Sequence, residues 1–381
     1  MAHALHAPFT APRLATHVPA PALVQWLEGR AAFDALAPEW DALVARTDDQ
    51  LFYRHAFLSL WLDAFAPGAR LAVLVQREGG RLVAALPLLR RRLRVCGLPA
   101  RAWCAPANLH SCRSDLLAED PAAAARAFAA ALAARRDWDL VQLCDVPPGG
   151  RAERLLAAAP ESGLLAGRWA SLRPPYVALP ATMEALERRL GSKHRTALRS
   201  RRRRLAARGR VTLERIAGGD RMEQALAEGL ALEASGWKGR AGTAIRQHPA
   251  TLRFYTTLAQ EAADRGALAL WFLRVDGRAV AFQYLLEHRD RCLLLKQAYD
   301  EAWRDCGPGQ LLMEDVLRAA IRRGFAEFDL LGDDAPAKRL WTDRTRQHGW
   351  IFLFRGPWGR LLHALKFRVA PWLRRRRAAR A

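Results

Sequence analysis

The sequence predicts a mixed α/β protein with two tandem units, each a mixed sheet with flanking helices. The first observation is its size: 381 residues, half of them hydrophobic, suffice for two domains with real cores. The second is internal repetition, because a hairpin followed by a helix and a buried strand occurs twice, about 190 residues apart. Strands in this order, separated by helices, indicate an α/β unit with mixed strands.

The first unit, expected over residues 1–180, begins with helices. Apolar residues recur at helical spacing over 33–46 and again over 55–65. Residues 70–95 then form two apolar stretches around Gly79-Gly80, which predicts a β-hairpin. A helix beginning at Asp120 or Pro121 and a buried strand complete this unit.

The second unit, expected over residues 181–355, repeats the same order after a very basic segment. The remaining residues, 356–381, form a basic tail. The elements expected in the second unit are a helix with a break near Gly191-Ser192, a basic helix, a strand from about Arg210, a hairpin around Asp276-Gly277, a strand over 291–300, a helix from about Gln310 and a buried strand over 326–332.

Charge gives a further indication of partners. The formal net charge is +22, which indicates nucleic acid or an anionic membrane as a contact; compositional drift toward arginine on solvated faces is the alternative. The tail places Leu, Phe and Trp beside an arginine cluster, a composition typical of peripheral membrane contact; a disordered basic end is the alternative. Most basic residues are arginine, so a surviving lysine indicates a need for a compact ammonium or a removable proton. The five lysines are Lys193, Lys238, Lys296, Lys338 and Lys366.

Several patterns bear on compartment and metal content. No apolar run approaches 18 residues, so we expect no transmembrane helix, and the first residues lack the pattern of a signal peptide. Six cysteines without a CxxC pair indicate a reduced compartment. We therefore expect a cytoplasmic protein, with peripheral contact at the inner face of the plasma membrane as an addition. Cys104, His110 and Cys112 lack a fourth ligand at useful spacing, so no metal is expected.

The stretch RDCGPGQLLMEDVLRAAIRRG, residues 304–324, raises the question of an anion site. A strand is expected to end near Tyr299 and a helix to begin near Gln310. The free N–H groups and positive dipole end of a helix start attract anions, and Gly307 and Gly309 allow close approach. A purely structural turn is the alternative, since neither a P-loop nor GxGxxG is present.

The stretch LEASGWKGRAGTAI, residues 232–245, follows an expected helix. Glu233, Trp237 and Lys238 precede two glycines, so the loop is either mobile or closely approached by a ligand. The alternative is a helix end with a packing tryptophan.

The stretch FDLLGDDAPAKRLWTDR, residues 328–344, places Asp329 in a strand and Asp333, Lys338 and Trp341 in the loop beyond it. Polar residues just past the carboxyl end of a strand face the ligand crevice in α/β sheets. A plain surface loop is the alternative.

Together these three stretches resemble the acetyltransferase-like domain of the GNAT superfamily associated with bacterial cellulose and exopolysaccharide biosynthesis. The blocks are E-x3-WK-G at 233–239, AYD at 298–300 with PG-x-LL at 308–312, and FD-x2-GD-x4-K-x2-W at 328–341. The resemblance covers roughly residues 180–345. The family is related to the Fem-type aminoacyltransferases, which carry two GNAT-like domains, and this implies two GNAT-like domains here.

The resemblance implies transfer of an acyl group, most simply acetyl, from acyl-CoA to an amine or hydroxyl of a small-molecule or saccharide acceptor. The CoA pyrophosphate would then lie on Cys306, Gly307, Gly309, Gln310, Leu311 and Leu312. The loop DCGPGQ departs from the usual GNAT loop, which leaves the donor open.

Roles for individual residues follow from the same resemblance. We expect Glu233 and Asp329 to act as base or to orient the substrate, and Tyr299 to protonate the leaving thiolate. Lys338 joins them as a catalytic candidate that binds an anionic group. The substrate-binding candidates are Trp237, Lys238, Asp333 and Trp341. A covalent role for Cys306 is disfavoured, because no histidine is near it in sequence.

Two alternatives remain open at this point. One is a Fem-type transfer from aminoacyl-tRNA, with the basic segment 192–210 binding the tRNA phosphates. The other is a non-enzymatic module that binds nucleic acid or anionic lipid. The basic segment lacks interleaved aromatic residues for base stacking, which argues against sequence readout.

Overall fold

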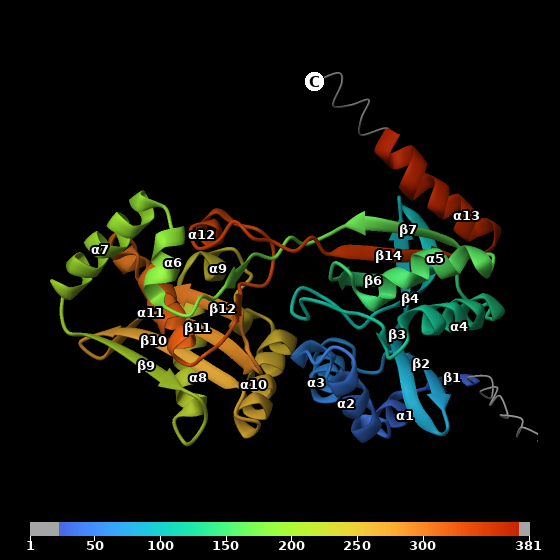
Figure 1. The fold of residues 1–381 in the computed structure, drawn as a ribbon, viewed down its shortest axis with the longest axis horizontal. Helices are drawn as coiled ribbons and strands as arrows, with labels where there is room; N and C mark the ends of the chain where they lie inside the picture. The colour runs from blue at the N-terminus through green and yellow to red at the C-terminus, as the bar shows by residue number, and fades with distance from the viewer. Residues whose placement is uncertain (1–22, 373–381) are drawn as a thin grey trace, which may run out of the picture.

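The computed structural model describes residues 23–372 and consists of two mixed sheets, each flanked by helices (Figure 1). This confirms the predicted fold class. The N-terminal 22 residues and the arginine cluster at 373–381 lie outside the described residues.

The first sheet has the strand order β1-β2-β3-β4-β6-β14-β7, with β5 beside β3. Among the described strands of this sheet, only β4 and β6 pair in parallel. Its elements, apart from β14, are β1 Leu23–Glu28, α1 Arg30–Asp34, α2 Ala37–Arg46, α3 His55–Phe65, β2 Leu71–Glu78, β3 Arg81–Val95, β4 Leu98–Cys104, β5 Leu117–Ala118, α4 Pro121–Ala134, β6 Leu140–Val146, α5 Arg154–Glu161 and β7 Leu165–Ala170.

The second sheet has the strand order β8-β13-β12-β11-β10-β9, again with one parallel pair, β12 and β13. The remaining elements are β8 Tyr176–Ala178, α6 Met183–Arg189, α7 Ser192–Ala206, β9 Val211–Ile216, α8 Met222–Ser235, α9 Trp237–Arg240, α10 Pro249–Asp264, β10 Leu268–Val275, β11 Arg278–His288, β12 Arg291–Tyr299, α11 Pro308–Arg322, β13 Glu327–Asp329, α12 Pro336–Arg339, β14 Gly349–Phe354 and α13 Gly356–Ala364.

Two strands pair with the sheet of the other expected unit. β14 comes from the second unit but lies between β6 and β7 of the first sheet, whereas β8 precedes residue 181 and lies beside β13 of the second sheet. The two connecting segments run antiparallel: His348 N–H donates to Leu172 O at 2.9 Å and Arg346 N–H to Pro174 O at 3.0 Å. The two sheets are therefore linked by a paired ribbon rather than by a single linker.

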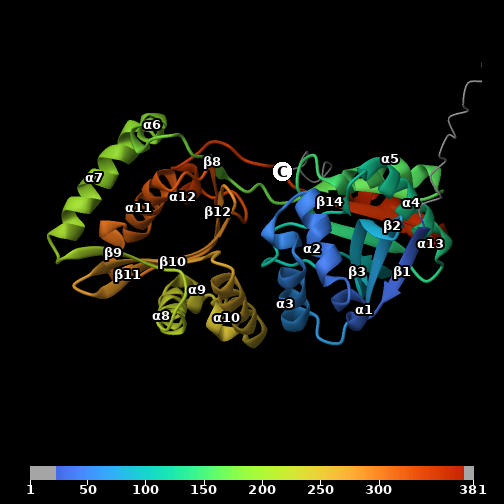
Figure 2. The same cartoon turned by 60° about the horizontal axis from the view of Figure 1, so that its bottom comes forward.

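Helices cover both faces of the second sheet (Figure 2). α6, α7 and α11 lie on one face and α8 and α10 on the other, where α10 packs on α3 of the first unit. The rings of Phe57 and Phe254 meet edge to face at 5.6 Å in this contact. One apolar core therefore extends from the first unit into the second, so the two units are packed against each other.

Several local predictions are confirmed. The hairpins turn at Gly79-Gly80 and Asp276-Gly277, and the Asp120 carboxylate accepts the N–H groups of Ala122 and Ala123 at the start of α4. One expectation was wrong, and one strand was missed. The stretch 33–46 is not one helix: α1 ends before Pro38, whose ring cannot continue a helix through that turn. The edge strand β1 was also missed, because six residues give too little periodicity.

Candidate functional site

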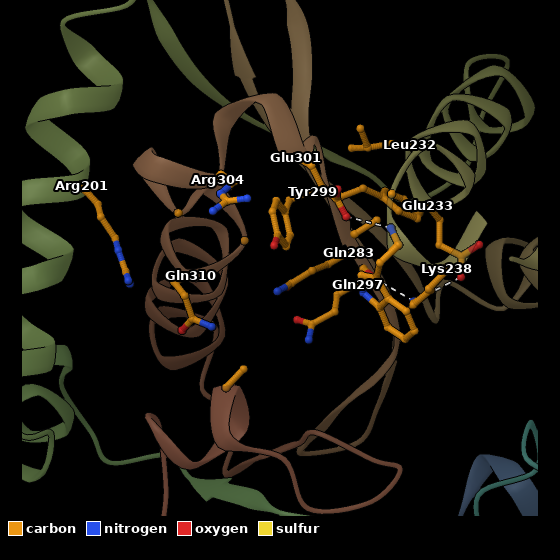
Figure 3. A pocket seen from close by; sticks show the side chains of 17 residues that line it. Arg201, Leu232, Glu233, Lys238, Gln283, Gln297, Tyr299, Glu301, Arg304 and Gln310 are labelled. Atoms are coloured by element: carbon orange, nitrogen blue, oxygen red, sulfur yellow. Dashed lines mark hydrogen bonds and ion pairs between the residues drawn. The ribbon is translucent and has the colours of Figure 1, made fainter. Parts of the chain in front are cut away.

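A cavity of about 430 Å³ opens where β12 ends and α11 begins. Figure 3 shows two chemically different ends, with Arg201, Arg304 and Gln310 on one side and Glu233 and Lys238 on the other. Tyr299, Gln283 and Gln297 lie between these two ends. The site brings together the two stretches around GPG and WKG that the sequence singled out. It is lined by Arg201, Leu232, Glu233, Gly236, Trp237, Lys238, Phe282, Gln283, Gln297, Ala298, Tyr299, Glu301, Arg304, Gly307, Gly309, Gln310 and Ala337.

The start of α11 presents a donor group to this cavity. The N–H groups of Gln310 and Leu311 both donate to Gly307 O, at 3.0 and 3.3 Å. Pro308 has no N–H, and that of Gly309 has no acceptor within the described part of the chain. The positive end of a 15-residue helix therefore faces the cavity with an unused donor.

Two guanidinium groups add positive charge at the same end. Arg201 reaches the cavity from α7, and Arg304 from the turn between β12 and α11. Neither has an acidic partner among residues 23–372, in contrast to Arg202, which is paired with Glu314 and Asp315. A helix start with two unpaired arginines is a suitable site for a phosphate or pyrophosphate.

Gly307 is required here for two reasons. Its φ of +56° lies in the left-handed region, where a side chain is strained. A Cβ would also lie 2.8 Å from Cδ of Arg201, so any side chain would displace that arginine. Gly309 has more room, since its Cβ would lie 3.4 Å from Cδ1 of Tyr299.

Glu233 and Lys238 form the opposite end. Oε1 of Glu233 lies 3.2 Å from Nζ of Lys238, and Oε2 accepts the N–H of Ile245 at 2.9 Å. Nζ of Lys238 also donates to Gln297 O at 3.2 Å. Both carboxylate oxygens of buried Glu233 are thus engaged, which makes Glu233 a positioning residue for Lys238 and for the loop after α8.

Trp237 covers this end of the cavity and is 58 % exposed. The backbone N–H of Trp237 donates to Oε1 of Glu301 at 2.8 Å, and Glu301 also pairs with Arg240. Tyr299, at the end of β12, is 39 % exposed and keeps its phenol accessible to a bound molecule.

Gln283 was missed from the sequence. It lies on β11, is only 1 % exposed, and its Oε1 has no hydrogen-bond partner. A buried acceptor left unsatisfied costs stability, so its presence in a cavity wall points to a ligand donor group. The signal was a single amide within the apolar run VAFQYLL.

Lys296 was also not among the expected site residues, although it is one of the five lysines. Its Nζ lies 5.0 Å from the ring centroid of Tyr255, whose hydroxyl is 3.1 Å from Nδ1 of His110. Burial, and after it the charge of Lys238, lower the pKa of Lys296 to about 8. Burial likewise lowers the pKa of His110 to about 4, so this histidine is neutral at neutral pH.

Asp329 lies outside the cavity. It is 1 % exposed, pairs with Arg113 of the first unit at 2.6 Å, and accepts the N–H of Leu331 at 2.9 Å. Asp329 was expected as a base, but this geometry makes it part of the contact between the two units.

The charged side chains of the loop after β13 likewise lie outside the cavity, although Ala337 of this loop lines it. Nζ of Lys338 donates to the carbonyls of Leu331 and Asp333, and Oδ1 of Asp333 accepts the N–H of Arg173 at 2.9 Å. Burial lowers the pKa of Lys338, although Asp329 and the other acids near it act in the opposite direction. These side chains hold the loop rather than facing the cavity.

Three of the residues expected to bind the CoA pyrophosphate are buried, and so is Trp341. Leu311 and Leu312 are fully buried in the core of the second unit, so only their backbone could contribute. Cys306 is buried too, and desolvation raises the pKa of its thiol, which argues against a nucleophile. Trp341 acts indirectly: its Nε1 donates to Oε1 of Gln310 at 2.7 Å and fixes that cavity side chain.

Within residues 23–372, no three His, Cys, Asp or Glu side chains are grouped as metal ligands. His110 instead faces Tyr255 and stacks on Phe65. The helices of that part of the chain include none with the length and apolarity needed to cross a membrane.

Comparison with known proteins identifies the second unit. Residues 192–339 match the model of the GNAT acetyltransferase domain, a span that begins at α7 and ends in α12. No curated protein sequence matches the chain. The match indicates a GNAT acetyltransferase-type domain in the second unit, and it supports a transferase over the non-enzymatic alternative.

Solved structures show the same fold over most of the chain at low identity. FemX is 14 % identical with a TM-score of 0.59, covering 89 % of this chain and 99 % of its own. A conserved protein of unknown function from Bacteroides thetaiotaomicron is 16 % identical with a TM-score of 0.51, covering 84 % and 97 %. A C-terminal domain assigned to a lysylphosphatidylglycerol synthetase of Agrobacterium fabrum is 14 % identical with a TM-score of 0.50, covering 87 % and 95 %.

Proposed function

We propose that the chain transfers an acyl group, most simply acetyl, from acyl-CoA to an amine or hydroxyl acceptor in the cavity at the start of α11. The observation that carries this proposal is the unused Gly309 N–H beside Arg201 and Arg304, neither of which has an acidic partner within residues 23–372. A diphosphate carries two negative charges that match this end of the cavity, and the GNAT match supports a thioester donor.

Different parts of the cavity bind different parts of the two substrates. The α11 end holds the phosphates, and the amides of Gln283 and Gln297 orient the acyl group in the middle. The acceptor then lies toward Lys238, whose ammonium is held by Glu233. Fixing both reactants in one cavity removes much of the entropic barrier to their reaction.

The chemical step is attack of the acceptor nitrogen or oxygen on the thioester carbonyl. The new bond to carbon forms, the carbon–sulfur bond breaks, and the acceptor proton leaves to a base or to water. In this proposal Tyr299, which lines the cavity, gives its phenolic proton to the departing thiolate. Lys238, which also lines the cavity, stabilises the negative charge that develops on the carbonyl oxygen in this proposal.

Aminoacyl-tRNA is the second candidate donor. The observation that favours it is the outer surface of α7, where Arg199, Arg203 and Arg204 are exposed and without acidic partners in the described structure. A small-molecule or saccharide acceptor, and a place in exopolysaccharide biosynthesis, remain predictions from the sequence.

Two arginines on one helix provide the test. Arg201 lines the cavity, whereas Arg199 lies on the same helix and is exposed. We expect acetyl-CoA to raise the melting temperature of the wild type, and Arg201→Ala to weaken CoA binding about tenfold or more through loss of a charge-assisted contact. Arg199→Ala should bind acetyl-CoA like the wild type.

Variants at these arginines also distinguish acyl-CoA from aminoacyl-tRNA as the donor. If tRNA binds tightly, acetyl-CoA has no effect on melting, and Arg199→Ala/Arg203→Ala abolishes the tRNA binding, the CoA proposal is rejected in favour of aminoacyl-tRNA. A series of acyl-CoAs of increasing chain length, followed by thiol release with added amines, then identifies the acyl group and the acceptor class.

A further inference from the structure

The last described helix exposes large apolar side chains along one face. α13 continues past Ala364 through a π-helical turn, Leu365–Val369. Positions 358, 361, 365, 369 and 372 succeed one another at steps of three or four residues, which places them on one side of the helix. We call these residues the apolar stripe. The exposed fractions are 39 % for Trp358, 44 % for Leu361, 40 % for Val369 and 45 % for Trp372.

The opposite side of the helix is firmly packed on the first sheet. Leu362 is fully buried, and a Cβ on Gly359 would lie 2.8 Å from Asp139 O. The ring of Phe367 sits so close to Gly167 of β7 that a Cβ there would lie 2.4 Å from it. Figure 1 shows the helix along the outer edge of the first sheet, with its end projecting beyond the strands. The apolar stripe is therefore held in place and faces outward.

Positive charge borders the apolar stripe. Arg360 and Arg368 are exposed and have no acidic partner among residues 23–372. The β3–β4 hairpin lies against the helix, since Nε1 of Trp358 donates to Pro99 O at 2.9 Å. Arg91 lies on the side of that hairpin that carries Leu93 and Val95, which pack beneath the helix.

The sequence around the helix contains no compensating acid. Residues 344–381 include no Asp or Glu, and five of the last nine residues are arginine. The carboxylate of Asp139, whose backbone lies close to Gly359, is already paired with Arg101 at 2.8 Å. The basic run at 87–95 thus lies beside the helix, and the sequence continues after the described residues with a second basic run, 374–380.

We propose that α13, its π-helical continuation and the arginines around them dock the protein on an anionic lipid surface, with the helix lying in the plane of the interface. Exposed Trp, Leu and Val beside arginines are the composition that such helices use. A second copy of the chain would bring the same arginines face to face, which disfavours a symmetric dimer through this surface. Nucleic acid would leave the apolar stripe without a partner. This inference concerns the first sheet and is independent of the proposed donor site.

Vesicle co-sedimentation of the full chain tests the proposal. The probes are vesicles of phosphatidylcholine alone and vesicles with about one part in four phosphatidylglycerol. We expect the wild type to bind only the anionic vesicles. Removing two interfacial arginines, as in Arg360→Glu/Arg368→Glu, should weaken that binding roughly 30-fold or more. Leu361→Asp/Val369→Asp should weaken it at least about tenfold, because two apolar contacts are lost.

A matched control distinguishes a specific surface from general basicity. Arg199→Glu/Arg203→Glu changes the net charge by the same amount on exposed positions of α7 and should bind the vesicles like the wild type. Equal loss of binding in this control, or no wild-type binding to anionic vesicles, overturns the proposal. So does a wild-type dimer in light scattering that Leu361→Asp/Val369→Asp converts to a monomer, since the apolar stripe would then join two copies. Melting temperatures verify that each variant is folded.

Discussion

Arg113 of the first unit and Asp329 of the second form an ion pair at 2.6 Å, with only 5 % and 1 % of their side chains exposed. Arg113 also donates to Oε1 of Gln50 at 2.6 Å and lies over the ring of Phe52. Asp329 pairs more distantly with Arg346, in the ribbon that links the two sheets. One buried carboxylate thus connects both units and their connecting segment.

Asp329→Ala is expected to lower the free energy of unfolding by about 3–5 kcal/mol, because it leaves Arg113 charged, buried and unpaired. Urea unfolding measures this change. Asp305→Ala provides the comparison, because the pair of Asp305 with Arg208 is about half exposed and should contribute no more than about 1 kcal/mol. A stable Asp329→Ala with normal donor binding and greatly reduced turnover would instead restore Asp329 as a base.

Sequence patterns predicted the parts of this fold that depend on local signals. Alternating apolar strands around Gly79-Gly80 and Asp276-Gly277, and the Asp120 cap, each lie within a short window, and each is found in the structure. The exchange of β14 and β8 between sheets could not be predicted, because it depends on long-range pairing and leaves no periodic signal.

The site shows the same limit. One cavity brings together five residues that the sequence singled out: Glu233, Lys238, Tyr299, Gly307 and Gly309. Asp329 lies elsewhere because its partner, Arg113, is 216 positions away, and such a contact is invisible in one sequence. Gln283 was missed because a single amide in a strand is usually a satisfied core residue, and only the structure shows its unpaired oxygen.

Gly307→Ala should both destabilise the protein and impair the donor site. The left-handed φ of +56° costs about 1–2 kcal/mol with a side chain, and the new Cβ pushes Arg201 out of position. Gly324→Ala is the matched variant, since its φ is +80° and a Cβ added there would meet nothing within 4 Å. Urea unfolding should show a similar loss for both, whereas only Gly307→Ala should lose the acetyl-CoA-dependent rise in melting temperature. If Gly307→Ala and Gly324→Ala both keep the rise caused by acetyl-CoA, Arg201 does not contact the donor.

Because of Lys296, the free energy of unfolding should increase with pH in the alkaline range. Its folded pKa of about 8 lies below the ordinary lysine value, so between these two pH values the unfolded chain binds a proton that the folded chain lacks. The free energy of unfolding contributed by Lys296 therefore rises as the pH increases from about 8 to about 10, by up to roughly 3 kcal/mol. Urea unfolding at several pH values measures the rise.

Lys296→Met should remove that rise and make the protein more stable than the wild type at pH about 7, because a buried ammonium is replaced by an apolar side chain of similar length. Lys193→Met, at an exposed position of α7, should change stability by less than about 0.5 kcal/mol. An identical pH dependence in wild type and Lys296→Met would show that another group carries the effect.

Gln283→Leu should make the protein more stable and weaken its binding of acetyl-CoA. Oε1 of Gln283 is buried without a partner, so replacing the amide with an apolar side chain should raise the free energy of unfolding by about 1 kcal/mol. Gln76 on β2 of the first sheet is 4 % exposed and has the same unpaired Oε1, but it lies outside the cavity. Gln76→Leu should therefore give a similar gain with unchanged acetyl-CoA binding, while Gln283→Leu weakens that binding about tenfold. Calorimetric titration with acetyl-CoA measures the difference, and equal affinities in the two variants would exclude Gln283 from the donor site.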